Sequence, residues 1–163
     1  EGFFDKEGLE AQKIIEPKAI GNIVKAEGEY VLREDEAGRF KLYEYPKKDE
    51  EYVIGGDTAE GLEHGDESVW VVINKRTSET VCVYNHRIPP DEFAEDGILL
   101  ANYYNEAIIA PEAKGYGYGV CQDIWKDYGN IYRNVKTKTG EEKETNDLGF
   151  ITSTPSRRQM LAQ

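Results

Sequence analysis

The sequence predicts an α/β domain built on a mixed five-stranded sheet with flanking helices and an amino-terminal β-hairpin extension. Two observations point to this fold class. From Tyr52 onward, short apolar runs rich in β-branched residues recur between turn residues, and later runs alternate with stretches of helical spacing. The chain has 163 residues, which is enough for one ordinary domain with its own core.

Residues 1–51 are predicted to form an amino-terminal extension that packs on the same domain. Within this extension, Tyr30–Leu32 and Phe40–Tyr45 have the character of two short strands. They flank a turn at Asp35–Gly38, so we expect them to pair as a hairpin. The charged stretch Pro46–Glu51 then leads into the core, residues 52–163.

The core pattern is three strands, then helix, strand, helix and strand. The corresponding residues are 52–57, 68–73, 80–84, 89–104, 107–110, 120–128 and 131–132. Three strands with short links can form an antiparallel meander. The fourth strand must then cross over through a helix and join in parallel beside the first. This gives the strand order 3-2-1-4-5, which is the order of the ribonuclease H fold.

The sequence also predicts the local structure of three further segments. The glycine-rich stretch Gly115–Gly119 is expected to be the turn from the fourth strand into the second helix. The charged stretch Gly140–Asp147 is expected to be a solvated loop. Ser156–Gln163 has the character of the opening of a helix.

The predicted topology places two carboxylates at one end of the sheet. Asp57 ends the first strand and Glu112 follows the fourth, and the two strands are expected to be parallel neighbours about 4.8 Å apart. Two carboxylates that close repel each other unless a cation lies between them. Hard divalent cations such as Mg²⁺ or Mn²⁺ prefer oxygen ligands. Asp66 either supports this site or closes a turn, and Lys114 lies just beyond Glu112.

Composition excludes several classes of protein. Acidic residues outnumber basic ones 32 to 20, and the net charge of -12 argues against a polybasic coat on nucleic acid. It does not exclude a nuclease, whose metal-binding carboxylates are themselves acidic. The sequence has no apolar stretch of transmembrane length and no secretory signal pattern. Because it begins at Glu1 and has only one methionine, we expect an excised piece of a longer polypeptide.

Four residues of reactive or aromatic type are expected to be structural. Cys82 and Cys121 lack the spacing of zinc ligands and are predicted to be small, reduced core residues. Trp70 and Trp125 are predicted to belong to the core and not to platforms on which bases stack.

Several motifs together resemble the nuclease domain of phage large terminase subunits. Tyr52–Gly61, followed by Asp66–Ser68, is similar to the first acidic motif of that family, and Tyr103–Glu112 is similar to the second. Asn130–Arg133 and Gly149–Arg157, continuing to Leu161, resemble the downstream segments. The resemblance extends from about Tyr52 to the end of the chain.

The resemblance implies a metal-dependent endonuclease of ribonuclease H type that cuts concatemeric double-stranded DNA. It implies that Asp57 and Glu112 bind Mg²⁺ or Mn²⁺ in a two-metal site and that Asp66 is a supporting acid. Lys114, Arg157 and Arg158 are candidates for contact with DNA phosphates. The implied partners are an ATPase domain, a small terminase subunit and a portal, in the cytoplasm of an infected bacterium.

The chain departs from the family pattern in one respect. The third acidic motif of the family should follow the segment that ends at Gln163, so we expect an incomplete metal site and impaired cleavage. Two other functions remain open. One is an actin-like or sugar-kinase-like half that binds ATP, although Asp57–Gly61 fits the glycine-rich phosphate hairpin of that class only loosely and the sequence has no internal duplication. The other is a non-catalytic module that docks to DNA or to the portal.

Overall fold

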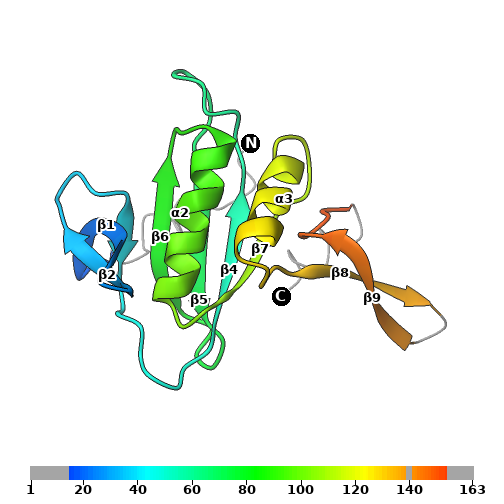
Figure 1. The fold of residues 1–163 in the computed structure, drawn as a ribbon, viewed down its shortest axis with the longest axis horizontal. Helices are drawn as coiled ribbons and strands as arrows, with labels where there is room; N and C mark the ends of the chain where they lie inside the picture. Colours follow the sequence, from blue (N-terminus) through cyan, green and yellow to red (C-terminus); the bar gives the residue numbers. More distant parts are fainter. Residues whose placement is uncertain (1–14, 139–140, 154–163) are drawn as a thin grey trace, which may run out of the picture.

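A seven-stranded mixed sheet with two helices against it forms the body of the molecule (Figure 1). The structure is a computed structural model, and it describes residues 15–138 and 141–153. The strands of this sheet, in chain order, are β1 (Ala19–Ala26), β2 (Glu29–Glu34), β3 (Phe40–Leu42), β4 (Tyr52–Asp57), β5 (Ser68–Asn74), β6 (Thr80–His86) and β7 (Ile108–Pro111). The helices are α2 (Pro90–Tyr103) and α3 (Gly117–Asp127), and β8 (Arg133–Lys138) pairs with β9 (Glu141–Leu148) in a separate two-stranded sheet.

The predicted core topology is confirmed for its first four strands. β4, β5 and β6 form an antiparallel meander, and α2 carries the chain across to β7, which pairs in parallel with β4. The order β6-β5-β4-β7 is the predicted order 3-2-1-4. Prolines at the start of α2 fit its first turn, where no backbone donor is required.

The fifth strand is present only as two isolated parallel bridges. Ile131 pairs with Ile109, and Phe150 pairs with Glu112. Between these two points the chain leaves the sheet as the β8–β9 hairpin, which extends beyond β7 and α3 (Figure 1). The prediction that Gly140–Asp147 is a loop is therefore wrong, because Glu141–Leu148 is a strand. Its charged composition hid the strand, since a hairpin outside the core needs no apolar alternation.

The amino-terminal strands extend the sheet beyond β6, in the order β2-β1-β3-β6. The expected hairpin between Tyr30–Leu32 and Phe40–Tyr45 is wrong, because β1 lies between β2 and β3 and pairs with both. The actual hairpin joins β1 to β2 through Glu27 and Gly28, which both have positive φ angles, as a type I′ turn requires. The turn at Asp35–Gly38 exists, but it carries the chain over the end of β1.

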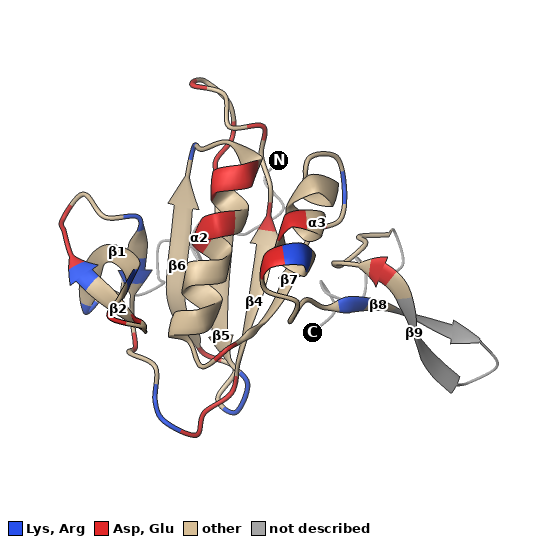
Figure 2. Ribbon diagram, viewed as in Figure 1, with Lys and Arg blue, Asp and Glu red and all other residues tan. Residues whose placement is uncertain are grey.

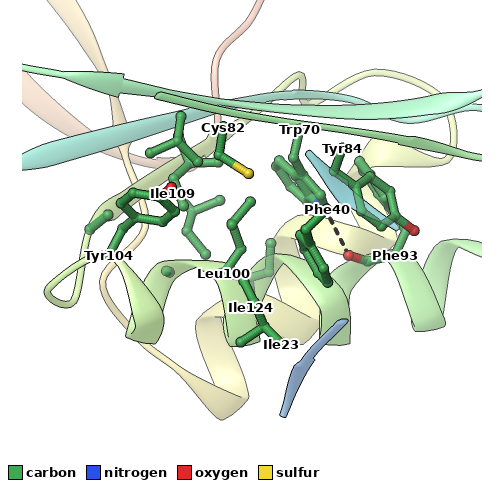
Figure 3. Packing of buried hydrophobic residues seen from close by; sticks show 14 of the residues in the cluster. Ile23, Phe40, Trp70, Cys82, Tyr84, Phe93, Leu100, Tyr104, Ile109 and Ile124 are labelled. Carbon is green, nitrogen blue, oxygen red and sulfur yellow. Dashed lines mark hydrogen bonds between the residues drawn. The ribbon is translucent and has the colours of Figure 1, made fainter. Parts of the chain in front are cut away.

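Both helices pack against the same face of the sheet and enclose the main core (Figures 1 and 3). α2 contributes Phe93 and Leu100 to this core, and α3 contributes Ile124. The ring of Trp70 stacks on Phe93 with centroids 4.2 Å apart, and its Nε1 donates to the Phe93 carbonyl (Figure 3). Trp70 is fully buried, so the prediction that it belongs to the core is confirmed.

A polar contact joins the amino-terminal strands to α2. Arg39 donates to Asp96 at 2.7 Å, and the Tyr84 hydroxyl donates to the same carboxylate oxygen at 2.9 Å. The contact with Asp96 raises the pKa of Arg39, and burial together with Asp96 raises the pKa of Tyr84. Strands β1, β2 and β3 thus share one sheet with the core strands.

Candidate metal centre at the carboxyl ends of β4 and β7

Two carboxylates lie next to each other where the parallel strands β4 and β7 end. The register pairs Gly56 with Pro111, so Asp57 and Glu112 occupy the next positions of the two neighbouring strands. The Glu112 backbone N–H donates to the Gly56 carbonyl at 2.7 Å and fixes this register. Figure 2 shows acidic residues at this end of β4. The structure therefore brings together the two residues for which the sequence predicts metal binding.

The electrostatics of the pair agree with this proximity. Desolvation raises the pKa of Asp57 above its usual range, and the negative charge of Glu112 raises it further. A hydrogen bond from the Thr58 backbone N–H acts in the opposite direction. Because like charges at short range disfavour ionisation, a divalent cation between the two carboxylates would relieve the repulsion.

Asp66 lies in the loop before β5, near enough to Asp57 for its charge to act on that carboxylate. Its side chain is exposed, and its charge also raises the pKa of Asp57. Within the part of the chain that the structure describes, however, no three or more Asp, Glu, His or Cys residues form a group that could hold a metal ion. Carboxylate oxygens suit Mg²⁺ or Mn²⁺, but the described residues supply an incomplete ligand set.

The backbone holds Glu112 from both sides. Gly56 accepts its N–H on the β4 side, and the Ala113 N–H donates to the Phe150 carbonyl at 2.8 Å on the other. The start of α3 also comes close, because a Cβ at Gly117 would overlap the Glu112 carbonyl oxygen. Only glycine permits this approach. The prediction that Gly115–Gly119 leads from strand to helix is confirmed, with α3 beginning at Gly117.

Of the three basic residues that are candidates for contact with DNA phosphates, only Lys114 lies among the described residues. Lys114 is exposed in the turn between Glu112 and α3, and its backbone N–H donates to the Glu112 carbonyl. It thus lies at the same end of the sheet as the carboxylates. Arg157 and Arg158, and the helix expected over Ser156–Gln163, lie outside the described residues.

Sequence reasoning missed three residues around the pair. The Tyr116 hydroxyl donates to Glu60 at 2.6 Å, which joins the loop after Asp57 to the loop after Glu112. The Thr58 hydroxyl oxygen, next to Asp57, is buried and has no hydrogen-bond partner in the described structure. The position of Thr58 directly after the carboxylate was the only signal available. The contact between Glu60 and Tyr116 depends on tertiary structure and left no local pattern.

A cleft of about 530 Å³ lies elsewhere, between α3 and the β8–β9 hairpin. Its walls include Tyr118, Trp125 and Arg133, but neither Asp57 nor Glu112. Trp125 is 43% exposed and Arg133 lies 4.4 Å above its ring, so the prediction that Trp125 belongs to the core is wrong. The cleft and the candidate metal centre at Asp57 and Glu112 are therefore separate places on the molecule.

Comparison with solved structures shows the same fold in nuclease domains. The large terminase nuclease from thermophilic phage G20c with bound cobalt aligns with a TM-score of 0.60 and 17% identity, over 78% of this chain and 58% of that one. The magnesium-bound structure aligns with a TM-score of 0.58 and 16% identity, over 78% of this chain and 59% of that one. The zinc-bound structure gives a TM-score of 0.51 and 20% identity, over 59% of this chain and 54% of that one.

These alignments establish a class of fold. The chain has the mixed α/β architecture of a terminase nuclease domain and spans less than three-fifths of the length of those solved chains. The resemblance stated from the sequence motifs is thus confirmed at the level of fold. No protein-family profile matches the sequence, and no curated protein matches it. Among the described residues, no helix is long and apolar enough to cross a membrane.

Proposed function

We propose that this chain is the nuclease part of a viral large terminase, an endonuclease that cuts concatemeric double-stranded DNA during genome packaging. The observation that carries the proposal is the parallel pairing of β4 with β7, which brings Asp57 and Glu112 together at one end of the sheet. The shared fold with terminase nucleases whose structures hold magnesium, zinc or cobalt supports it.

In this proposal Asp57 and Glu112 hold Mg²⁺ or Mn²⁺ through their carboxylate oxygens. Two such ions, when bound, would supply an activated water and would stabilise the leaving oxygen of a phosphodiester. The hydrogen bond from the Glu112 N–H to the Gly56 carbonyl keeps the two carboxylates at one strand end. Asp57 and Glu112 would thereby fix the positions of the ions and, through them, the orientation of the phosphate. Asp66 supports Asp57 from the neighbouring loop.

Basic residues would guide the DNA backbone past the carboxylates. Lys114 lies in the turn after Glu112 and is exposed, so it is available to a phosphate. We assign Arg157 and Arg158 the same role on the basis of the family resemblance. With a net charge of -12, the contact must be local, because the molecule as a whole repels DNA.

The rest of the assignment rests on the resemblance. We propose that a third carboxylate, which the family pattern places after Gln163, completes the metal site, and that cleavage is impaired without it. The proposed partners are an ATPase domain, a small terminase subunit and a portal, in the cytoplasm of an infected bacterium.

The test measures metal binding and DNA cleavage on the same variants. Calorimetry with MnCl₂ and plasmid cleavage with Mg²⁺, Mn²⁺ or EDTA would compare the parent chain with Asp57→Asn and Glu112→Gln. Glu95→Gln is the matched control, because Glu95 is an exposed carboxylate on α2. Cleavage is measured in this chain and in one extended past Gln163 by the parent's next segment. We expect both site variants to lose manganese binding, and to lose cleavage by about 100-fold or more in the extended chain.

Three results would contradict this proposal, the first its site and the other two its activity. A folded extended chain that cuts DNA equally well after Asp57→Asn would remove Asp57 from the site. A folded extended chain that does not cut, but whose melting temperature rises with ATP, would favour the ATP-binding alternative. A chain that binds DNA without cutting it would favour the docking module.

A further inference from the structure

The strand β2 forms one edge of the seven-stranded sheet, at the opposite end from β7 (Figure 1). The β7 edge is partly covered, because Ile131 bridges to Ile109 and Phe150 bridges to Glu112. On its inner side β2 pairs with β1 along its whole length. Within residues 15–138 and 141–153, no strand or bridge pairs with its outer side. The backbone of this edge is therefore available to another strand.

The turn between β1 and β2 determines which backbone groups of β2 point outward. The two-residue turn Glu27–Gly28 makes Ala26 and Glu29 a hydrogen-bonded pair. The same alternation holds at the other end of the hairpin, where the Asp35 N–H donates to the Ile20 carbonyl at 2.9 Å. The backbone groups that β1 leaves unpaired therefore belong to the intervening residues, Tyr30, Leu32 and Glu34.

The side chains of β2 alternate between the two faces of the sheet. Tyr30 and Leu32 lie on the face that the helices cover, and they pack against the core. Glu29, Val31 and Arg33 lie on the opposite face. Glu29 and Arg33 are exposed, and Val31 is half-buried. No salt bridge among the described residues includes Glu29 or Arg33.

The sequence of β2 is self-complementary about Val31. When two copies pair antiparallel with their Val31 residues opposite each other, Glu29 of each copy lies opposite Arg33 of the other. On the helix-covered face, Tyr30 of each copy lies opposite Leu32 of the other. These last pairs are the hydrogen-bonded ones, so the outward backbone groups find partners in the same register. Charge, apolar contact and backbone pairing thus agree in one arrangement.

Other registers of the same edge are less favourable. A slip of one residue places outward backbone groups opposite groups that are already bonded to β1. Pairing centred on Leu32 brings Glu29 opposite Asp35, which is also acidic, and pairing centred on Tyr30 leaves Glu29 opposite Val31. Charged side chains on an edge strand usually discourage association. Here they discourage these other registers and permit the one centred on Val31.

We propose that two copies of this chain associate through β2, antiparallel and centred on Val31, to form one continuous sheet with the helices of both copies on the same face. The inference is independent of the proposed nuclease activity, because β2 lies at the opposite end of the sheet from β7 and the carboxylate pair. Since each copy has a net charge of -12, the dimer should be weak and should form only in concentrated solution.

The experiment is sedimentation equilibrium on the full chain with the charges of the pair reversed. Glu29→Arg and Arg33→Glu each place like charges opposite each other, so each should raise the dissociation constant about tenfold or more. The double variant should restore it. An equal mixture of the two single variants should form a heterodimer, because both of its cross-strand pairs are complementary. Glu63→Arg is the control, since Glu63 is exposed in the loop between β4 and β5 and the change in net charge equals that of Glu29→Arg.

Amide exchange measured by NMR on the parent chain identifies the edge directly. The amides of Tyr30 and Leu32 should exchange more slowly as the protein concentration rises, whereas the Val31 amide, which is bonded to β1, should not change. Circular dichroism checks that each variant is folded. The exchange measurement and the double variant still test the register if one single variant does not fold.

Three results would overturn the dimer proposed here. One is a parent chain that stays monomeric up to about 1 mM. Another is a dimer whose dissociation constant does not respond to the reversals, which would use another surface. The third is protection of the Tyr30 and Leu32 amides that does not depend on concentration, which would assign the edge to a segment of the same chain.

Discussion

The Glu112 backbone N–H donates a 2.7 Å hydrogen bond to the carbonyl of Gly56, the residue before Asp57. This bond extends the parallel pairing of β4 and β7 by one position beyond Pro111. The two carboxylates are thereby held next to each other by backbone geometry, and they remain so although they repel. If the pair is the proposed metal site, the repulsion costs stability in the absence of a cation, and this cost can be measured.

Replacing Asp57 by Asn should stabilise the metal-free protein at neutral pH. Desolvation and the charge of Glu112 raise the pKa of Asp57 in the folded state. A carboxyl group whose pKa is raised by folding favours the folded state below its unfolded pKa, and this contribution is lost as pH rises through the folded pKa. Because Asp57 is exposed and screened by solvent, we expect a gain of only about 0.5 kcal/mol at pH 7.

The measurement is urea unfolding in EDTA at pH 7 and at pH 3, with Glu95→Gln as the control. The gain for Asp57→Asn should be present at pH 7 and should disappear at pH 3, where the parent carboxyl group is protonated. Added Mn²⁺ should reverse the order at pH 7 by stabilising the parent alone. A loss of stability in EDTA at pH 7 would contradict the repulsion between Asp57 and Glu112.

A methyl group at Gly56 should disturb the core directly behind the site. A Cβ there would overlap the Trp70 ring, which is stacked on Phe93 and bonded to its carbonyl and so has little room to move. We expect Gly56→Ala to lower the free energy of unfolding by about 2 kcal/mol. Gly55→Ala is the matched control on the same strand, because a Cβ at Gly55 meets nothing within 4 Å.

Denaturant unfolding followed by tryptophan fluorescence measures both glycine variants. Gly56→Ala should also change the near-ultraviolet circular dichroism of Trp70, while Gly55→Ala should leave the spectrum unchanged. Equal stability of the two variants would mean that Trp70 adapts. The close approach of the Trp70 ring would then not explain why position 56 is a glycine.

The core topology could be predicted from the sequence because its elements carry strong local signals. β5 is a continuous run of β-branched and aromatic residues, and α2 begins at two prolines with Phe93 and Leu100 on one face. Handedness of the crossover then leaves β7 only the position beside β4. The adjacency of Asp57 and Glu112 follows from that topology without any knowledge of side-chain contacts.

The wrong predictions concern contacts between parts of the chain that are distant in the sequence. β1 is a long strand with half-polar alternation, and its insertion between β2 and β3 depends on the turn at Glu27 and Gly28. Trp125 was predicted to belong to the core, yet it lines the cleft beside β8 and β9. No local pattern in the sequence specifies either arrangement.

Both cysteines should be unreactive in the folded protein. Burial raises the pKa of Cys82 to about 12 and that of Cys121 to about 11, and both are free thiols. Because the thiolate is the reactive form, at pH 8 Cys121 should react with a disulfide reagent about 100-fold more slowly than in the unfolded chain, and Cys82 more slowly still. Stopped-flow absorbance in the presence and absence of urea measures this. A fast native phase would show that the cleft beside Cys121 admits the reagent.

Removing Asp96 should release the amino-terminal strands from α2. The Asp96 carboxylate accepts from both Arg39 and Tyr84, and its side chain is 12% exposed. Asp96→Ala leaves the buried Tyr84 hydroxyl and the Arg39 guanidinium without this acceptor, so we expect a loss of about 3 kcal/mol in the free energy of unfolding. Glu92→Ala is the control, since Glu92 lies 4.0 Å from Arg39 and is 51% exposed. This variant should lower the free energy of unfolding by less than about 0.5 kcal/mol.

Hydrogen exchange should locate the loss of stability. Amides of β1 and β3 should exchange faster in Asp96→Ala, while those of β4 and β5 keep their order of protection. Equally faster amide exchange in all strands would mean that Asp96 stabilises the whole sheet and not only the contact between the amino-terminal strands and α2.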